Sequence, residues 1–259
     1  MHMHMQVHEL QDYVKKVPQI TALFWLTKIF ATTFGETSGD ALSMSLNLGY
    51  LLSTFIFAGI FISLLYFQIQ SKAYKPYLYW ATIIASTTVG TTLADFVDRS
   101  LGIGYLGGSL LLLSLVLVSL FSWYRVEGSI NPSVVNLPRT QIFYWLTITF
   151  SQTLGTALGD WTSDSAGLGY SGGIWLFGGL IVLMALLYFF SRVSKTILFW
   201  ATFVLTRPLG AVVGDFLDKP ISSGGLDLSR FMASFVLLLA IVICVYWSTR
   251  NDRQSIKSV

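Results

Sequence analysis

A motif of seventeen residues occurs four times in this chain without an insertion or a deletion, and this repetition constrains the fold more than any other feature. In each copy a Trp follows an aromatic residue, and Thr, Gly and Asp stand two, ten and fifteen residues after that Trp. Tandem copies of one sequence fold into copies of one structural unit. The copies are FWLTKIFATTFGETSGD, YWATIIASTTVGTTLAD, YWLTITFSQTLGTALGD and FWATFVLTRPLGAVVGD, with Trp25, Trp80, Trp145 and Trp200.

The spacing of the copies indicates that a pair of repeats was itself duplicated. Successive copies start 55, 65 and 55 residues apart. Copies 1 and 3 are followed by LGY (48–50 and 168–170), whereas copies 2 and 4 end in DFxD and a basic residue (95–99 and 215–219). Each repeat is long enough for two membrane spans, so all repeats keep one orientation. The chain therefore predicts parallel repeats with pseudo-two-fold, approximately four-fold, symmetry about the membrane normal.

Long apolar segments predict an all-α integral membrane protein. The chain is 54% hydrophobic and 11% charged, with a mean hydropathy of +0.65, whereas soluble domains carry about 25% charged residues. Each segment has close to the ~20 residues that span a bilayer as a helix. We therefore expect eight transmembrane helices from four tandem helical hairpins, at approximately 19–40, 46–68, 76–97, 101–124, 140–161, 168–191, 195–217 and 229–248.

Basic residues predict the orientation of these segments. Eleven Lys and Arg residues lie in loops and tails on one side of the predicted helices, and three lie on the other side. The positive-inside rule then places both termini in the cytoplasm, and we expect a multi-pass protein of a bacterial inner membrane. The predicted parts are an N-terminal tail (1–18), two four-helix halves (19–124 and 140–248), a cytoplasmic linker (125–139) and a C-terminal tail (249–259).

Several functional classes lack support in the sequence. The only cysteine, Cys244, lies in an apolar segment, so the chain cannot form a disulfide or a multi-cysteine metal site by itself. The three histidines, His2, His4 and His8, all lie in the N-terminal tail, which argues against a His-ligated site in the bilayer. No nucleotide-binding loop, zinc-protease motif or nucleophile elbow is present. We therefore expect no enzyme, no cofactor and no nucleic-acid partner.

The repeated motif resembles that of a known group of proteins. With its four aromatic-Trp-x-Thr motifs, the chain resembles bacterial membrane proteins built from four tandem two-helix repeats of unknown function, each with a Trp, which are described as uncharacterised membrane-anchored proteins. The resemblance covers about residues 20 to 248. It implies the eight-helix architecture, and it implies no activity.

Polar residues of the motif share one helix face. Positions 3, 7, 11 and 15 after each Trp lie four residues apart, so they form one slowly turning stripe. Glycines at positions 10 and 14 lie beside the stripe, and small residues in this spacing let helix backbones approach closely. We therefore expect the four motif helices to surround one polar centre, with the other four facing lipid. The stripes read Lys28, Thr32, Glu36 and Asp40; Ile83, Thr87, Thr91 and Asp95; Ile148, Gln152, Thr156 and Asp160; and Phe203, Arg207, Ala211 and Asp215.

Charged residues of the stripe are the candidate site. Five acids and two bases give the centre a net charge of −3, and charges at membrane depth line water-filled cavities or pair with each other. Glu36 is the main candidate because no other copy has an acid there, and Arg207 is its expected partner if their helices face each other. We expect the Lys28 side chain to extend to the cytoplasmic interface. For the four aspartates, the alternative to ion binding is a structural role as helix caps. The ion-binding candidates are Glu36, Asp40, Asp95, Asp160, Asp215, Thr32, Thr87 and Gln152; Glu36 and Asp40 are the metal candidates, and Arg207 and Lys28 are the gating or charge-pairing candidates.

A small secondary transporter for a cation is the function that these residues favour. Carboxylate, hydroxyl and amide oxygens suit hard cations, and our specific expectation is a divalent metal such as manganese, with proton coupling as an option. The expected partners are the lipid bilayer and a small inorganic cation, with a homo-oligomer left open. The alternatives are a cation channel and a non-transporting membrane scaffold or sensor whose polar centre is structural.

Overall fold

The computed structural model describes residues 16–257, and these residues form helices and no strands. The all-α prediction is therefore confirmed for this part of the chain. The three histidines of the N-terminal tail lie outside the described residues. The last helix runs to Lys257, so it continues past the end expected at about 248.

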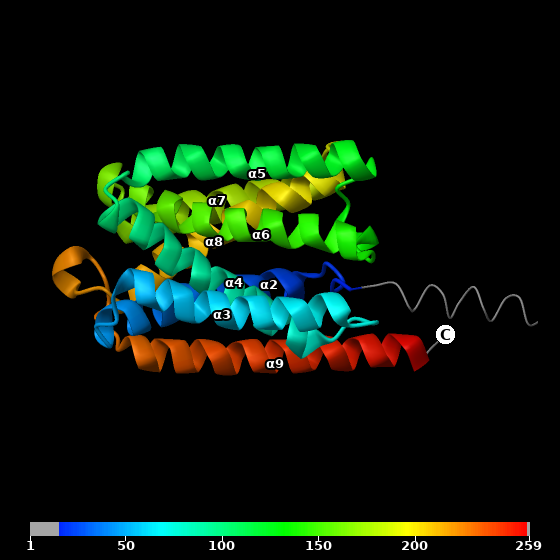
Figure 1. Ribbon diagram of the computed structural model, residues 1–259, viewed down its shortest axis with the longest axis horizontal. Helices are drawn as coiled ribbons and strands as arrows, with labels where there is room; N and C mark the ends of the chain where they lie inside the picture. The colour runs from blue at the N-terminus through cyan, green and yellow to red at the C-terminus, as the bar shows by residue number, and fades with distance from the viewer. Residues whose placement is uncertain (1–15, 258–259) are drawn as a thin grey trace, which may run out of the picture.

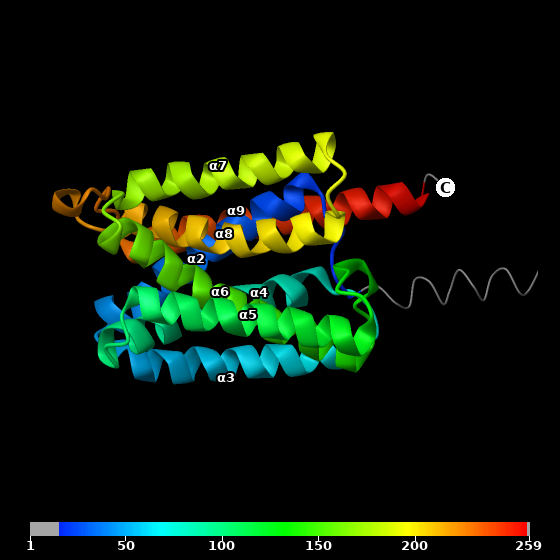
Figure 2. The same cartoon turned by 90° about the horizontal axis from the view of Figure 1, so that it is seen from above.

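Four helices carry the repeated motif and form an inner ring. They are α2 (Ala22–Asp40), α4 (Pro76–Asp95), α6 (Pro138–Asp160) and α8 (Lys195–Asp218). A single π-helical turn follows each of the first three, as η1 (Ala41–Ser45), η2 (Phe96–Ser100) and η4 (Trp161–Ser165). In the ring, α2 packs on α4, α4 on α6, α6 on α8 and α8 on α2 (Figures 1 and 2). The ring brings the four polar stripes around one axis, as the sequence predicts.

Four further helices cover the inner ring. These covering helices are α3 (Gly49–Gln70), α5 (Tyr105–Glu127), α7 (Gly169–Phe190) and α9 (Arg230–Lys257). Each packs on the inner helix of the next repeat: α3 on α4, α5 on α6, α7 on α8, and α9 on α2. The fourth repeat therefore closes the circle on the first.

The shared LGY sequence has a backbone explanation. Gly49 and Gly169 begin α3 and α7 with φ angles of +74° and +62°, where an L side chain is strained.

Two short 3₁₀ segments, η3 (Pro132–Val134) and η5 (Ile221–Ser223), lie in the longer connections.

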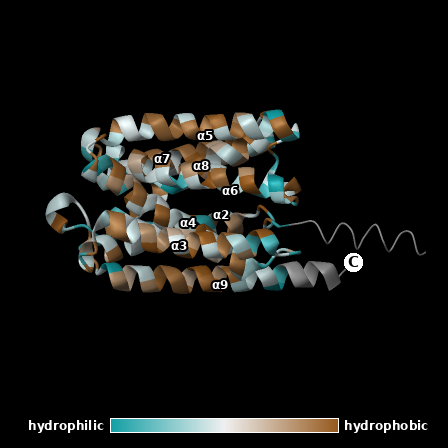
Figure 3. Ribbon diagram, viewed as in Figure 1, coloured by the Kyte–Doolittle hydropathy of each residue, from teal (hydrophilic) through white to brown (hydrophobic). Residues whose placement is uncertain are grey.

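Hydropathy separates the covering helices from most of the inner ring (Figure 3). Five helices are long and apolar enough to cross a membrane: the four covering helices and α8. Within these spans only 11–28% of the residues of the covering helices are buried, against 72% for α8. The remaining inner helices are rich in Thr and Ser, so their own hydropathy does not mark them as spans. The covering helices thus present large apolar side chains outward, and the inner helices keep their polar side chains inside.

Candidate ion-binding axis

Residues four apart on the inner helices form layers along the axis of the ring. Each layer takes one residue from each repeat, and every residue of the layers is buried. The layers run from an aromatic end, near the starts of the inner helices, to an aspartate end. In this order they are Phe24, Tyr79, Tyr144, Phe199; Lys28, Ile83, Ile148, Phe203; Thr32, Thr87, Gln152, Arg207; Glu36, Thr91, Thr156, Ala211; and Asp40, Asp95, Asp160, Asp215.

The first layer, called here the aromatic layer, closes one end of the axis. The hydroxyl groups of Tyr79 and Tyr144 lie 2.6 Å apart in a hydrogen bond. Phe24 and Phe199 complete the layer, with their ring centroids 6.3 Å apart. The stripe predicted from the sequence starts after the Trp and does not include this layer, although the same four-residue spacing extends to the aromatic residue just before each Trp.

Lys28 is fully buried and does not reach the interface, so the expected extension to the cytoplasmic side is wrong. Its ammonium donates to the side-chain oxygen of Gln152 at 3.3 Å and lies 4.2 Å from the centroid of the Phe203 ring. Among the described residues no carboxylate pairs with Lys28. An amide dipole and a ring face therefore stabilise this charge, and both are arrangements that favour a cation.

Arg207 and Glu36 form the ion pair that the sequence suggested. Nη2 of Arg207 lies 2.9 Å from Oε2 of Glu36, and both side chains are almost fully buried. The same nitrogen donates to the hydroxyls of Thr91, at 2.6 Å, and of Thr156. These three acceptors occupy one layer, so a single guanidinium nitrogen joins α2, α4 and α6 to α8.

The four repeat aspartates are bridged in two pairs by bases of the connecting segments. Arg99 lies 3.0 Å from Asp95 and 3.1 Å from Asp160, and thus joins repeats 2 and 3. Lys219 lies 2.6 Å from Asp40 and 3.1 Å from Asp215, and thus joins repeats 4 and 1. Asp40 also lies 3.8 Å from Arg230. Asp40, Asp95 and Asp160 make no side-chain helix-capping bond, so ion pairs take the place of the caps in the alternative expectation.

These bridges change the charge of the axis. The net charge of −3 counted from the sequence excludes Arg99 and Lys219, because both are predicted to lie in loops. In the structure both side chains reach the aspartate layer. Counted formally, with every group ionised, the five carboxylates of the stripes face Lys28, Arg207, Arg99 and Lys219, a sum of −1, and Arg230 also lies 3.8 Å from Asp40. Burial lowers the pKa of Lys219, but the carboxylates of Asp215 and Asp40 raise it by more, so the ammonium stays charged. The sequence signal for these partners was the basic residue four positions after the aspartate in copies 2 and 4.

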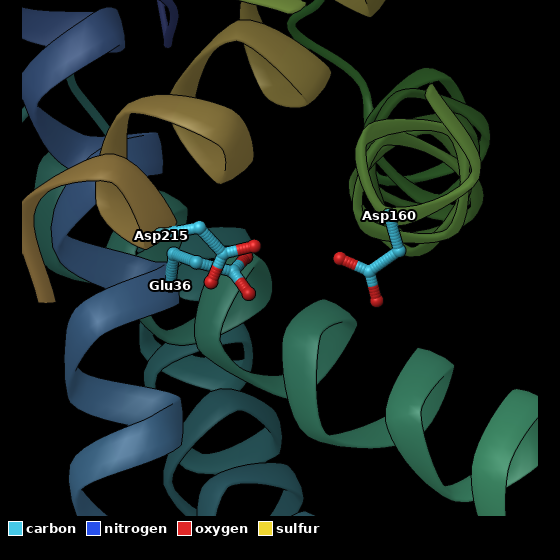
Figure 4. Close-up of side chains that lie close together, drawn as sticks. All are labelled: Glu36, Asp160 and Asp215. Carbon is cyan, nitrogen blue, oxygen red and sulfur yellow. The ribbon is translucent and has the colours of Figure 1, made fainter. Parts of the chain in front are cut away.

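Three carboxylates from three helices converge near the middle of the aspartate end. Glu36, Asp160 and Asp215 each place one oxygen within 4.8 Å of the others; they form the central triad. Glu36 and Asp215 lie side by side, and Asp160 points toward them from α6 (Figure 4). Asp40, predicted to bind a metal with Glu36, instead lies within the same distance of Asp215 and Asp218. We call this second group the mouth triad.

The remaining candidate residues divide between structural and unpaired positions. Thr32 donates to the backbone oxygens of Ile29, at 2.9 Å, and Thr206, at 3.1 Å, so its hydroxyl links α2 to α8. Gln152 accepts from Lys28. The hydroxyl of Thr87 has no hydrogen-bond partner among the described residues. Of these three side chains, only Thr87 has an oxygen without any hydrogen-bond partner among the described residues.

Comparison with known proteins identifies the repeat. A family described as Repeat of Unknown Function (DUF347) matches residues 23–74, 78–129, 143–194 and 198–254. Neither a curated protein nor a solved structure matches the chain. The four matched stretches begin just before the four Trp residues of the motif, and each takes in one inner and one covering helix.

Proposed function

The chain belongs to this family of repeats of unknown function, which carries no activity with it, and we propose from the geometry of the axis that the protein is a small secondary transporter for an inorganic cation. Our specific proposal is a divalent metal ion such as manganese, exchanged for protons along the axis of the inner ring.

The observation that carries this proposal is the central triad. Its three carboxylates come from three separate helices, and their oxygens lie within 4.8 Å of one another. Oxygens on opposite sides of a Mg²⁺, Mn²⁺ or Ca²⁺ ion are roughly 4–5 Å apart, since each metal–oxygen bond is about 2.0–2.6 Å. Carboxylates are also the ligands that hard cations prefer. An ion at the triad would take over the role that Arg207 and Lys219 have for Glu36 and Asp215.

Closure of the axis at both ends favours a carrier over an open channel. The aromatic layer interrupts the polar path at one end. The bridges made by Arg99 and Lys219 cover the other end. A carrier keeps its site closed on at least one side while the inner helices move relative to one another, and a site near the repeat axis is common among transporters.

A membrane scaffold or sensor is the second candidate, because the repeat aspartates already have cationic partners. Asp40, Asp95, Asp160 and Asp215 each lie within an ion pair with Arg99 or Lys219. Paired in this way, buried charges hold helices in register without any ion. Flux measurements separate this candidate from the transporter.

We place all eight helices across the bilayer of a bacterial inner membrane, with both termini in the cytoplasm. The covering helices shield α2, α4 and α6, whose polar side chains face the axis rather than lipid. Lys72, Lys75, Arg139 and Lys195 lie at the aromatic end, which would then be the cytoplasmic end.

The test is cation uptake by liposomes that contain the purified protein. Saturable Mn²⁺ uptake is expected for the parent chain, and Glu36→Gln is expected to lower it at least about tenfold, because a ligand charge is lost. Glu127→Gln is the matched control, since Glu127 pairs with Arg139 at the aromatic end, away from the axis. Absence of flux for Mn²⁺, Mg²⁺, Ca²⁺ and Na⁺ contradicts transport and favours the scaffold; flux that does not saturate favours a channel.

A further inference from the structure

The mouth triad has the composition of a second cation site. Asp40 comes from α2, and Asp215 and Asp218 come from the last turn of α8. One oxygen of each lies within 4.8 Å of the others, and the three residues are only 1%, 3% and 6% exposed. Asp215 belongs to both triads, so the two groups of carboxylates are contiguous.

Unpaired oxygens in the mouth triad are the second observation. Oδ1 of Asp40 and Oδ1 of Asp218 are buried and have no hydrogen-bond partner among the described residues. The other oxygen of Asp218 faces Nε of Arg230 at 3.4 Å, which is long for a charged hydrogen bond. A buried carboxylate oxygen without a partner is costly, and a bound cation would remove this cost.

Lys219 holds the place that such a cation would take. Its ammonium lies 2.6 Å from Asp40 and 3.1 Å from Asp215, between two ligands of the mouth triad. Lysine is a compact charge on a flexible stem, so it can leave these carboxylates without a change in the helices. The side chain is 13% exposed, which leaves it a way out toward the aspartate end of the axis.

The other half of the ring has the same sequence pattern without the same site. Asp98 stands three residues after Asp95, as Asp218 stands after Asp215, yet its carboxylate lies against Gly108 of α5 and joins no triad of the described residues. The base in this half is Arg99, which holds Asp95 and Asp160 at 3.0 and 3.1 Å. Asp98 therefore provides a matched control for Asp218.

We propose that the mouth triad is a second binding site for a hard cation, that Lys219 occupies it in the absence of the ion, and that Asp215 passes the ion to the central triad. This inference rests on the proposed transport function. It adds a defined entry to the central triad, on the side of repeats 4 and 1 and not on the side of repeats 2 and 3.

The two sites can be counted with Mn²⁺ in purified protein, because free aqueous Mn²⁺ gives an electron paramagnetic resonance signal that is lost on binding. Asp160→Asn removes a ligand of the central triad alone and is expected to retain Mn²⁺ binding. Adding Asp218→Asn to this variant is expected to weaken the remaining binding at least about tenfold, whereas adding Asp98→Asn leaves it unchanged. Lys219→Met in the same background is expected to tighten it, since the competing ammonium is gone.

Each outcome decides between the two proposals. If Asp160→Asn binds no Mn²⁺ while the parent chain does, the second site is wrong and the central site stands. If Asp218→Asn and Asp98→Asn have equal effects, the mouth triad is likewise wrong. Loss of binding on Asp218→Asn with no effect of Asp160→Asn retains the mouth triad and contradicts the central one. No binding by the parent chain contradicts both.

In liposomes, Asp218→Asn is expected to raise the KM for Mn²⁺ uptake with the maximal rate retained.

Discussion

Arg207 shows how one residue breaks the symmetry of four similar helices. Its layer holds Thr32, Thr87 and Gln152 in the other repeats, and only Arg207 reaches the next layer. Two of its nitrogens, Nε and Nη1, have no hydrogen-bond partner among the described residues, although the side chain is fully buried. The pair with Glu36 is therefore important mainly because each member would be an uncompensated buried charge without the other.

Removal of both members of this pair is expected to cost less stability than the sum of the two single removals. Glu36→Leu leaves Arg207 without its carboxylate and should lower the free energy of unfolding by about 3–5 kcal/mol. Glu36→Leu combined with Arg207→Leu should cost clearly less than the sum of the single changes. Unfolding of the purified variants in mixed micelles provides the measurement. Strict additivity would show that the two charges do not stabilise each other.

Asp98 predicts a pH dependence of stability. It lies in η2, outside the helical spans, and burial raises its pKa to about 6, although nearby Arg99 lowers it. A carboxyl group whose folded pKa is raised stabilises the fold below its ordinary pKa of about 4, and this contribution is lost as the pH rises through 6. Asp98→Asn should therefore stabilise the protein at pH 8 relative to the parent chain.

The unfolding midpoint of both chains between pH 4 and pH 8 checks this expectation. The difference between Asp98→Asn and the parent should grow as the pH rises. A difference that is independent of pH would show that the Asp98 carboxyl titrates alike in the folded and unfolded chains.

At the scale of the helices, small residues decide which backbones meet. A Cβ on Gly90 would lie 2.9 Å from the backbone carbon of Gln152 and from the backbone nitrogen of Thr153, so α4 and α6 touch there without a side chain between them. At Gly155 and Gly210 the space of the missing Cβ is filled mainly by side-chain atoms of Arg207 and Thr32 from neighbouring helices. The predicted role of these glycines in close packing is thus consistent with the contacts between the inner helices.

Gly90→Ala is expected to lower the free energy of unfolding by about 1–3 kcal/mol, because two backbones must separate to admit the methyl group. Gly59→Ala is the matched control: Gly59 lies in α3 with no atom near its missing Cβ, and the change should be neutral or slightly stabilising. Equal effects of the two substitutions would contradict close backbone contact at Gly90.

How far the sequence predicts this architecture depends on the element. The stripe predicts that the motif helices turn one face inward, because the four-residue spacing of polar side chains leaves them no other shared surface. It does not predict the position of Lys28, since a lysine near the membrane interface and one buried over Phe203 have the same local sequence. Nor does it predict that Arg99 bridges repeats 2 and 3, because that contact depends on the order of helices around the ring.

At the scale of the molecule, the covering helices interlock the two halves. The covering helix α5 of the first half packs on α6 of the second half, and α9 of the second half packs on α2 of the first. Neither half therefore buries its own inner helices completely. The repeat spacing predicts the duplication, but the exchange of covering helices follows only from the three-dimensional arrangement.

Division of the chain in the loop between α5 and α6 tests this interlocking. Each half expressed alone should be degraded or aggregate, whereas the two halves expressed together should assemble one to one and purify as a complex. Purification through a tag on one half, followed by measurement of how much of the other half is retained, gives the ratio of the two halves in the complex. Stable, separately folded halves would contradict the exchange.

The contact between α9 and α2 also has a consequence for biosynthesis. The helix that covers α2 leaves the ribosome after the other described helices. At about 5–20 residues per second, α2 waits roughly 10–40 seconds for α9. Their partners Gln152 and Arg207 also arrive later in translation. We therefore expect newly made chains to keep Lys28 and Glu36 without these partners until α6 and α8 have been made and the ring closes.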